Sequence, residues 1–161
     1  MATVTTLSAP AHGLSARGRS PYIVEQEIDL AAAATAKGSA LAAADIIEAI
    51  TLSGNVLVMA AGMECTATPS GGTGTVLDLG TDGDADEFVD GFAYDSASAG
   101  DYAAQASATT PVMVGASNTI DITIQAATTV STAGKVRVWA VLMNVDALGE
   151  MTADEVSRDQ A

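Results

Sequence analysis

Residues 119–126 read TIDITIQA, and this short stretch decides the fold class. Isoleucine stands at every second position, as Ile120, Ile122 and Ile124, and polar residues fill the positions between them. Side chains of a β-strand point alternately to the two faces of a sheet. The pattern therefore predicts a strand with one face in a core and the other face in water.

The two stretches that resemble it most lie at opposite ends of the chain. Residues 135–145 read KVRVWAVLMNV and are apolar on both faces beyond Arg137, which is typical of a central strand. We expect the only tryptophan, Trp139, to be buried there. Residues 22–30 read YIVEQEIDL and alternate in the same way, which predicts a half-buried strand.

Further strands are predicted between these stretches. Ser53, Gly54 and Asn55 form a turn-rich sequence between two apolar runs, which favours neighbouring antiparallel strands on either side. The alanine-rich residues 31–44 fit a helix and a loop equally well, because Gly38 and Ser39 interrupt them. The other expected strands are 45–52, 56–68, 75–79 and 111–115.

Many short strands without a long amphipathic helix predict an all-β fold, an antiparallel β-sandwich of jelly-roll type with an extended N-terminal arm. We divide the chain into an arm over residues 1–21, a sandwich domain over 22–146 and an acidic C-terminal tail over 147–161. Residues 94–110 are too poor in large apolar side chains to add to the core, and Tyr94 and Tyr102 are the expected surface aromatics.

The rarest residue types argue against an enzyme. The chain has 161 residues with one cysteine and one histidine, Cys65 and His12, so an internal disulfide and a cysteine-rich zinc site are excluded. His12 lies in the arm and makes a poor general base for Cys65, which we expect to be a small buried hydrophobe. The sequence predicts no catalytic residue and no cofactor.

Charge and hydropathy exclude two classes of partner. The net charge of −14 argues against nucleic-acid binding, which needs lysine and arginine to neutralise phosphates. No apolar run is long enough to span a membrane, so we expect no membrane partner. The first twenty residues lack the apolar segment of a secretory signal, which predicts that the chain is made and first folded in a cytoplasm.

Basic residues are concentrated near the ends of the chain. Arg17 and Arg19 precede the first acid, and residues 38–134 contain no base. A basic arm on an acidic body suits attachment to an acidic surface of a partner. We therefore predict that Arg17, Arg19, Pro21 and Tyr22 bind a partner.

Residues 78–91, DLGTDGDADEFVDG, are rich in acids and contain no base. An EF-hand frame that starts at Asp82 fails, because Glu87 occupies the glycine position and Ala93 the bidentate glutamate position. We expect a short helix capped by Asp84 or Asp86, with Phe88 and Val89 packed on the sheet. A looser calcium site remains an alternative, but the prediction is no metal.

Three segments carry a resemblance to a known class of proteins. They are ADIIEAITLSGNVLVMAAGMECTAT, TVLDLGTDGDADEFVDG and TIDITIQAATTVSTAGKVRVWAVLMNVD, which together span roughly residues 40–146. Their order resembles the small β-rich head proteins of tailed bacteriophages, in particular capsid decoration or cement proteins.

The resemblance implies a structural function. Such a protein has a jelly-roll-like body, commonly forms a homotrimer, sits on the outside of an icosahedral head and locks neighbouring major capsid protein subunits together. It implies a virion location on the capsid surface and no catalytic residue. Two alternatives remain: a phage tail or fibre component, and a carbohydrate-binding or calcium-dependent adhesion module.

Overall fold

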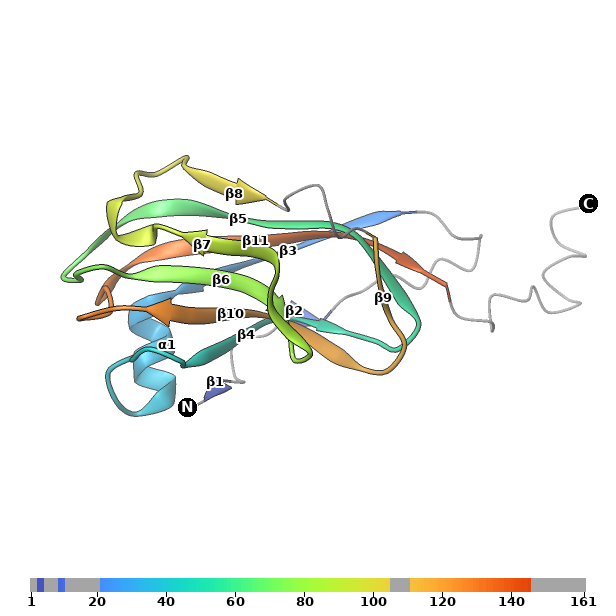
Figure 1. Ribbon diagram of the computed structural model, residues 1–161, viewed down its shortest axis with the longest axis horizontal. Helices are drawn as coiled ribbons and strands as arrows, with labels where there is room; N and C mark the ends of the chain where they lie inside the picture. Colours follow the sequence, from blue (N-terminus) through green and yellow to red (C-terminus); the bar gives the residue numbers. More distant parts are fainter. Residues whose placement is uncertain (1–2, 5–8, 11–20, 105–110, 146–161) are drawn as a thin grey trace, which may run out of the picture.

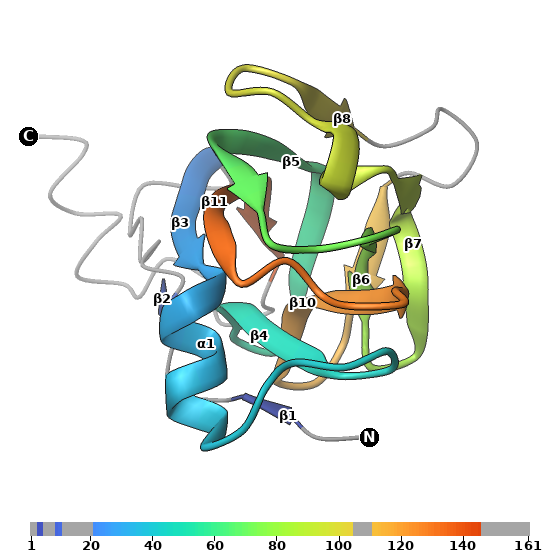
Figure 2. The same cartoon turned by 90° about the vertical axis from the view of Figure 1, so that its left-hand side faces the viewer.

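The computed structural model describes residues 3–4, 9–10, 21–104 and 111–145, which fold into two packed β-sheets (Figure 1, Figure 2). In chain order the elements are β1 (Thr3–Val4), β2 (Ala9–Pro10), β3 (Tyr22–Asp29), α1 (Leu30–Lys37), β4 (Ile46–Leu52), β5 (Val56–Ser70), β6 (Val76–Thr81), β7 (Asp84–Phe92), the 3₁₀ turn η1 (Tyr94–Ser96), β8 (Tyr102–Ala104), β9 (Val112–Val114), β10 (Asn118–Ala126) and β11 (Ala133–Asn144).

The two sheets have different strand orders. One sheet runs β1-β4-β10-β6-β7, with β2 also paired to β4, and we call it the β10 sheet. The other runs β3-β11-β5-β8, with β9 also paired to β5, and we call it the β11 sheet. From β3 onward all strand pairs are antiparallel, and the chain passes between the sheets at most connections. The predicted all-β antiparallel sandwich is confirmed.

The core lies between the sheets and is built by the predicted alternation. Ile120, Ile122 and Ile124 of β10 are fully buried, and they belong to the same core cluster as the buried residues of β11. Strand β11 lies between β3 and β5, so its predicted central position is confirmed. The inward residues of β11 are Val136, Val138, Ala140 and Leu142.

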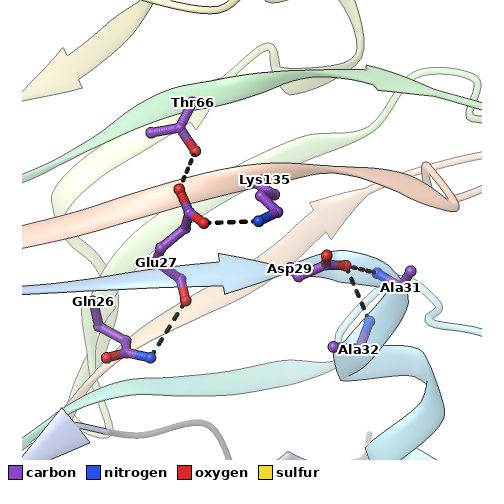
Figure 3. A network of polar contacts seen from close by, with 7 residues as sticks. All are labelled: Gln26, Glu27, Asp29, Ala31, Ala32, Thr66 and Lys135. Atoms are coloured by element: carbon purple, nitrogen blue, oxygen red, sulfur yellow. Dashed lines mark hydrogen bonds and ion pairs between the residues drawn. The ribbon is translucent and has the colours of Figure 1, made fainter.

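The alanine-rich stretch contains a helix followed by a loop. The carboxylate of Asp29 accepts hydrogen bonds from the backbone N–H groups of Ala31 (2.8 Å) and Ala32 (3.1 Å), which fixes the first turn of α1 (Figure 3). Gly38 ends the helix with a φ of 79°, a left-handed conformation that glycine adopts without strain. The helix lies at one end of the sandwich (Figure 1).

The acidic run forms a β-hairpin, and the predicted capped helix is wrong. Strand β7 begins at Asp84 and pairs antiparallel with β6. The hairpin folds back so tightly that a Cβ on Gly80 would lie 2.0 Å from the carbonyl oxygen of Asp84. Phe88 and Val89 are buried on the sheet as predicted.

The first residues of the chain lie along one edge of the β10 sheet. Strands β1 and β2 each pair in parallel with β4, Thr3 opposite Ile46 and Ala9 opposite Ile50. Each pairing is two residues long. Two short bridges therefore connect the predicted arm to the edge strand.

Candidate interaction surface

The outer face of the β11 sheet carries exposed apolar side chains at the ends of its strands. Ile23 is 71% exposed, Met113 52% and Met59 39%. Strand register places Ile23 and Met113 in adjacent rows across the sheet, and Met59 lies at a register shift between these rows. One row joins Met113, Leu57 and Met143, and the next joins Ile23, Val141 and Ala60.

Trp139 extends this surface toward the middle of the sheet. It is half-buried on the outer face, so the prediction of a buried tryptophan holds only in part. Its indole ring lies over Gly62, where a Cβ would approach the ring to 2.7 Å. The opposite neighbour in the register is Glu25. We call this surface the apolar face, made of Ile23, Leu57, Met59, Ala60, Met113, Trp139, Val141 and Met143.

Charged residues border the apolar face on one side. Glu27 accepts hydrogen bonds from Lys135 (2.9 Å) and from the hydroxyl of Thr66 (2.9 Å), which lower the pKa of its carboxyl (Figure 3). Arg137 lies 3.6 Å from Glu64 in the next strand. All of these side chains are exposed or half-exposed. The ion pairs therefore add little to the stability of the fold, and their main effect is to hold the charged side chains in place beside the apolar face.

The two exposed bases of the described residues both lie on this border. The described residues contain three bases, and Lys37 is largely buried in an ion pair with Asp45. Lys135 and Arg137 are 43% and 41% exposed. All charged residues on the strands of the β10 sheet are acids, namely Glu48, Asp78, Asp84, Asp86, Glu87, Asp90 and Asp121.

Asp121 is a buried carboxyl in the middle of the β10 sheet. It lies at a register shift between β10 and β4, is 3% exposed, and its Oδ1 has no hydrogen-bond partner among the described residues. Its pKa is raised from 3.8 to about 6, mainly by burial; a hydrogen bond with Thr119 opposes this rise, and the charges of Asp82 and Glu48 add to it. Nothing positive in this sheet compensates the charge.

The acidic hairpin is held by its own hydrogen bonds. Asp78 Oδ1 accepts from the backbone N–H of Gly91 (2.8 Å), and Glu87 accepts from the hydroxyl of Thr81 (3.0 Å). Burial raises the pKa of Asp78. Within the ranges that the structure describes, no three acids, histidines or cysteines gather closely enough to hold a metal ion.

Cys65 is a buried core residue, as predicted. Its side chain is buried, its Sγ donates to the carbonyl oxygen of Ala67 (3.4 Å), and burial raises the pKa of the thiol. A raised pKa keeps the sulfur protonated and unreactive. His12 lies outside the described residues.

The prediction that both Tyr94 and Tyr102 lie on the surface is wrong for Tyr94. Tyr102 is 74% exposed as predicted, but Tyr94 is fully buried in the core. Its hydroxyl has no hydrogen-bond partner in the described part of the chain. The ring fits beneath Gly134, whose φ is 110° and whose Cβ would lie 2.3 Å from the hydroxyl oxygen. The segment 94–110 therefore does contribute a large side chain to the core.

The predicted partner-binding residues are placed only in part. Arg17 and Arg19 lie outside the described residues. Pro21 is exposed just before β3. Tyr22 begins β3 opposite Leu142, and burial raises its pKa. Pro21 precedes Ile23 by two residues, whereas the side chain of Tyr22 packs against the core, on the face of β3 opposite to Ile23. The C-terminal tail is likewise outside the described residues.

One hollow lies at the α1 end of the sandwich. It has a volume of about 400 Å³ and is lined by alanines, threonines, Leu41, Val130 and Ser131. No titratable side chain lines it. Within the described residues, no helix is both long enough and apolar enough to cross a membrane.

No protein-family model and no curated protein sequence matches the chain. Solved structures do resemble it. A chain in the capsid of Ralstonia phage GP4 is 14% identical with a TM-score of 0.61, over 90% of this chain and 99% of that chain. A chain in the capsid asymmetric unit of cyanophage Pam1 is 19% identical with a TM-score of 0.57, over 84% and 90%.

A third similar chain comes from the acid-stable capsid of Helicobacter pylori bacteriophage KHP30. It is 11% identical with a TM-score of 0.50, over 75% of this chain and 86% of that chain. At these identities the likeness establishes a shared fold. Coverage is similar on both sides of each comparison, so the matched chains are close to this chain in length.

Proposed function

We propose that this chain is a virion structural protein of a bacteriophage, a capsid decoration or cement protein. In this proposal it binds the outside of an icosahedral head and stabilises contacts between major capsid protein subunits. The observation that carries the proposal is the match of nearly the whole fold to chains of similar length in phage capsids. Fold alone does not determine function, so the surface must fit as well.

The physical properties of the chain suit this role. Two sheets around one continuous core form a body that can transmit load between subunits. A net charge of −14 keeps free copies soluble and apart before assembly. Weak contacts then become effective where many sites on one shell raise the local concentration.

The proposal includes partners and a location. The partners are the major capsid protein and further copies of the chain in a homotrimer, and the location is the capsid surface after synthesis in the host cytoplasm. Arg17, Arg19, Pro21 and Tyr22 attach the arm to an acidic groove on the shell. Contacts of exposed arginines with acids weaken as salt rises.

The alternatives have less support. A phage tail or fibre component fits the same fold, but the similar chains belong to capsids. A carbohydrate-binding module needs exposed aromatic rings, and the burial of Tyr94 removes half of the expected pair. A calcium-dependent module needs clustered oxygen ligands, and the described acids form no such group.

The proposal is tested by co-sedimentation of the purified chain with phage heads that lack it. We expect saturable binding to these heads and no further uptake by heads that already carry the protein. Purified tails should not bind the chain. Uptake by tails but not by heads would favour the tail alternative, and no binding to either would contradict the proposal.

A further inference from the structure

The apolar face combines an exposed apolar centre with a border of both charge signs. Three of its side chains, Ile23, Met59 and Met113, are each more than a third exposed. They lie on strands whose other face lines the core. Large apolar side chains gathered on one face of a small domain are typical of protein interfaces. Methionine in particular adapts its shape to a partner surface.

Electrostatics restrict what this face can meet. Two copies of a chain with a charge of −14 repel each other wherever acidic surfaces approach. The border with Lys135 and Arg137 is the only part of the described surface where exposed bases offset the acids. Copies of this chain can therefore approach with the least repulsion through the β11 sheet.

The border also carries side chains of opposite charge close to the apolar centre. Glu25 is exposed beside Ile23 and makes no hydrogen bond or ion pair within the described ranges. Arg137 lies two residues from Trp139 on β11, opposite Glu27, and its ion pair with Glu64 is long, at 3.6 Å. An acid without a partner in the described residues and a weakly held base, both beside an apolar centre, offer charge complementarity to another copy of the chain.

We propose that the occupant of the apolar face is a second copy of this chain. This inference rests on the proposed function, which includes self-association. It adds the surface through which the copies meet. Ile23, Met59 and Met113 lose their exposure between copies, while Arg137 of one copy lies near Glu25 of the other. The acidic β10 sheet stays outside this contact.

The test is the solution mass of the full chain by sedimentation equilibrium, with one charge placed in the face. We expect the wild-type chain to associate at tens of micromolar. Ile23→Glu and Met113→Glu should each weaken association by more than about 30-fold, the cost of disrupting a central interface residue. The matched control, Ala126→Glu, adds the same charge on an exposed position of β10 and should associate like the wild type.

Methionine oxidation by dilute peroxide gives a second readout that does not require a variant to fold. Met59 and Met113 should be protected at high protein concentration and oxidised on dilution, while Met63, which is fully buried, should resist at both. Protection that does not change with concentration would mean that the chain covers its own face, for instance with residues 146–161, and would overturn the proposal.

Two further outcomes would also overturn it. A wild-type monomer at these concentrations whose Ile23→Glu variant fails to bind heads would assign the face to the shell protein. Association that survives both substitutions would place the contact elsewhere. Failure of head binding with association intact would instead contradict the proposed function and leave this inference standing.

Discussion

Single residues account for the least expected features of this chain. Asp121 and Tyr94 each bury a polar atom that has no hydrogen-bond partner in the described residues. Burying such a group without a partner costs about 1 to 3 kcal/mol. Neither burial follows from local sequence, because Asp121 stands where the alternation of β10 predicts an outward residue and Tyr94 lies in a segment of small polar residues.

Asp121 should make the fold less stable as pH rises through about 6. Its pKa is raised from 3.8 to about 6 in the folded chain, so between these values the folded chain holds a proton that the unfolded chain has released. The stability due to this proton is complete at low pH and is lost above pH 6. Relative to Asp121→Asn, the wild type should lose roughly 1 to 1.5 kcal/mol between pH 5 and pH 7.5.

Urea unfolding followed by the fluorescence of Trp139 measures this difference. The comparison with Asp121→Asn removes the contributions of other carboxyls, which both proteins share. Parallel pH curves for the wild type and Asp121→Asn would show that this carboxyl does not titrate in the expected range.

Replacing Tyr94 by phenylalanine should stabilise the fold by about 1 kcal/mol, because the change removes a buried hydroxyl without a partner and keeps the ring. Thermal unfolding would show a higher midpoint for Tyr94→Phe. Tyr102→Phe is the control and should change little, since Tyr102 is 74% exposed. A loss of stability in Tyr94→Phe would mean that the hydroxyl has a partner.

At the scale of elements, the hairpin of β6 and β7 shows how an acidic sequence can form a strand. Backbone pairing with β6 and two side-chain hydrogen bonds, at Asp78 and Glu87, hold it without a metal ligand set. The exposed acids of the turn remain in water, where their repulsion is screened. We therefore expect the hairpin to form without a cation.

We expect the unfolding temperature to be the same in calcium and in excess chelator. The described acids of the hairpin do not converge on a metal position. Magnesium at equal ionic strength separates specific binding from charge screening. A fall of more than a few degrees on adding chelator, on the order of 1 kcal/mol for a domain of this size, would show that an ion stabilises the fold.

Deleting residues 1–20 should change the unfolding transition little and lower occupancy on the head. Strands β1 and β2 contribute only two residues each to the edge at β4. The variant with Arg17→Gln and Arg19→Gln, which keeps these strands, should bind heads less tightly as well. Loss of the folded state on deletion would assign the segment to the β10 sheet, and undiminished head binding would exclude it from attachment.

Sequence predicted the elements whose alternation is regular and missed those formed by distant contacts. The alternating isoleucines predicted strand β10, because side chains on a sheet point to the same face at every second residue. The apolar residues on both faces of β11 predicted its central position. Strand β7 was missed because Asp84, Ala85, Asp86 and Glu87 show no alternation. The apolar face was not predicted, since its rows depend on the register of four strands.

At the scale of the whole molecule, the two sheets differ in their outer surfaces. The β10 sheet carries acids without a base, while the β11 sheet carries the apolar face and both exposed bases of the described residues. This division suits the proposed decoration role, with adhesive contacts on one side and a soluble surface on the other. In the proposed contact between copies, the acidic β10 sheets, which carry much of the charge of −14, stay apart.

The most direct test of the central claim is a cryo-electron microscopy map of the virion that contains this chain. The account predicts density for the β-sandwich on the outer surface of the head, at the junctions between major capsid subunits, with the strands of the β11 sheet turned toward neighbouring copies. Density for the chain in the tail, or its absence from the head, would contradict the account.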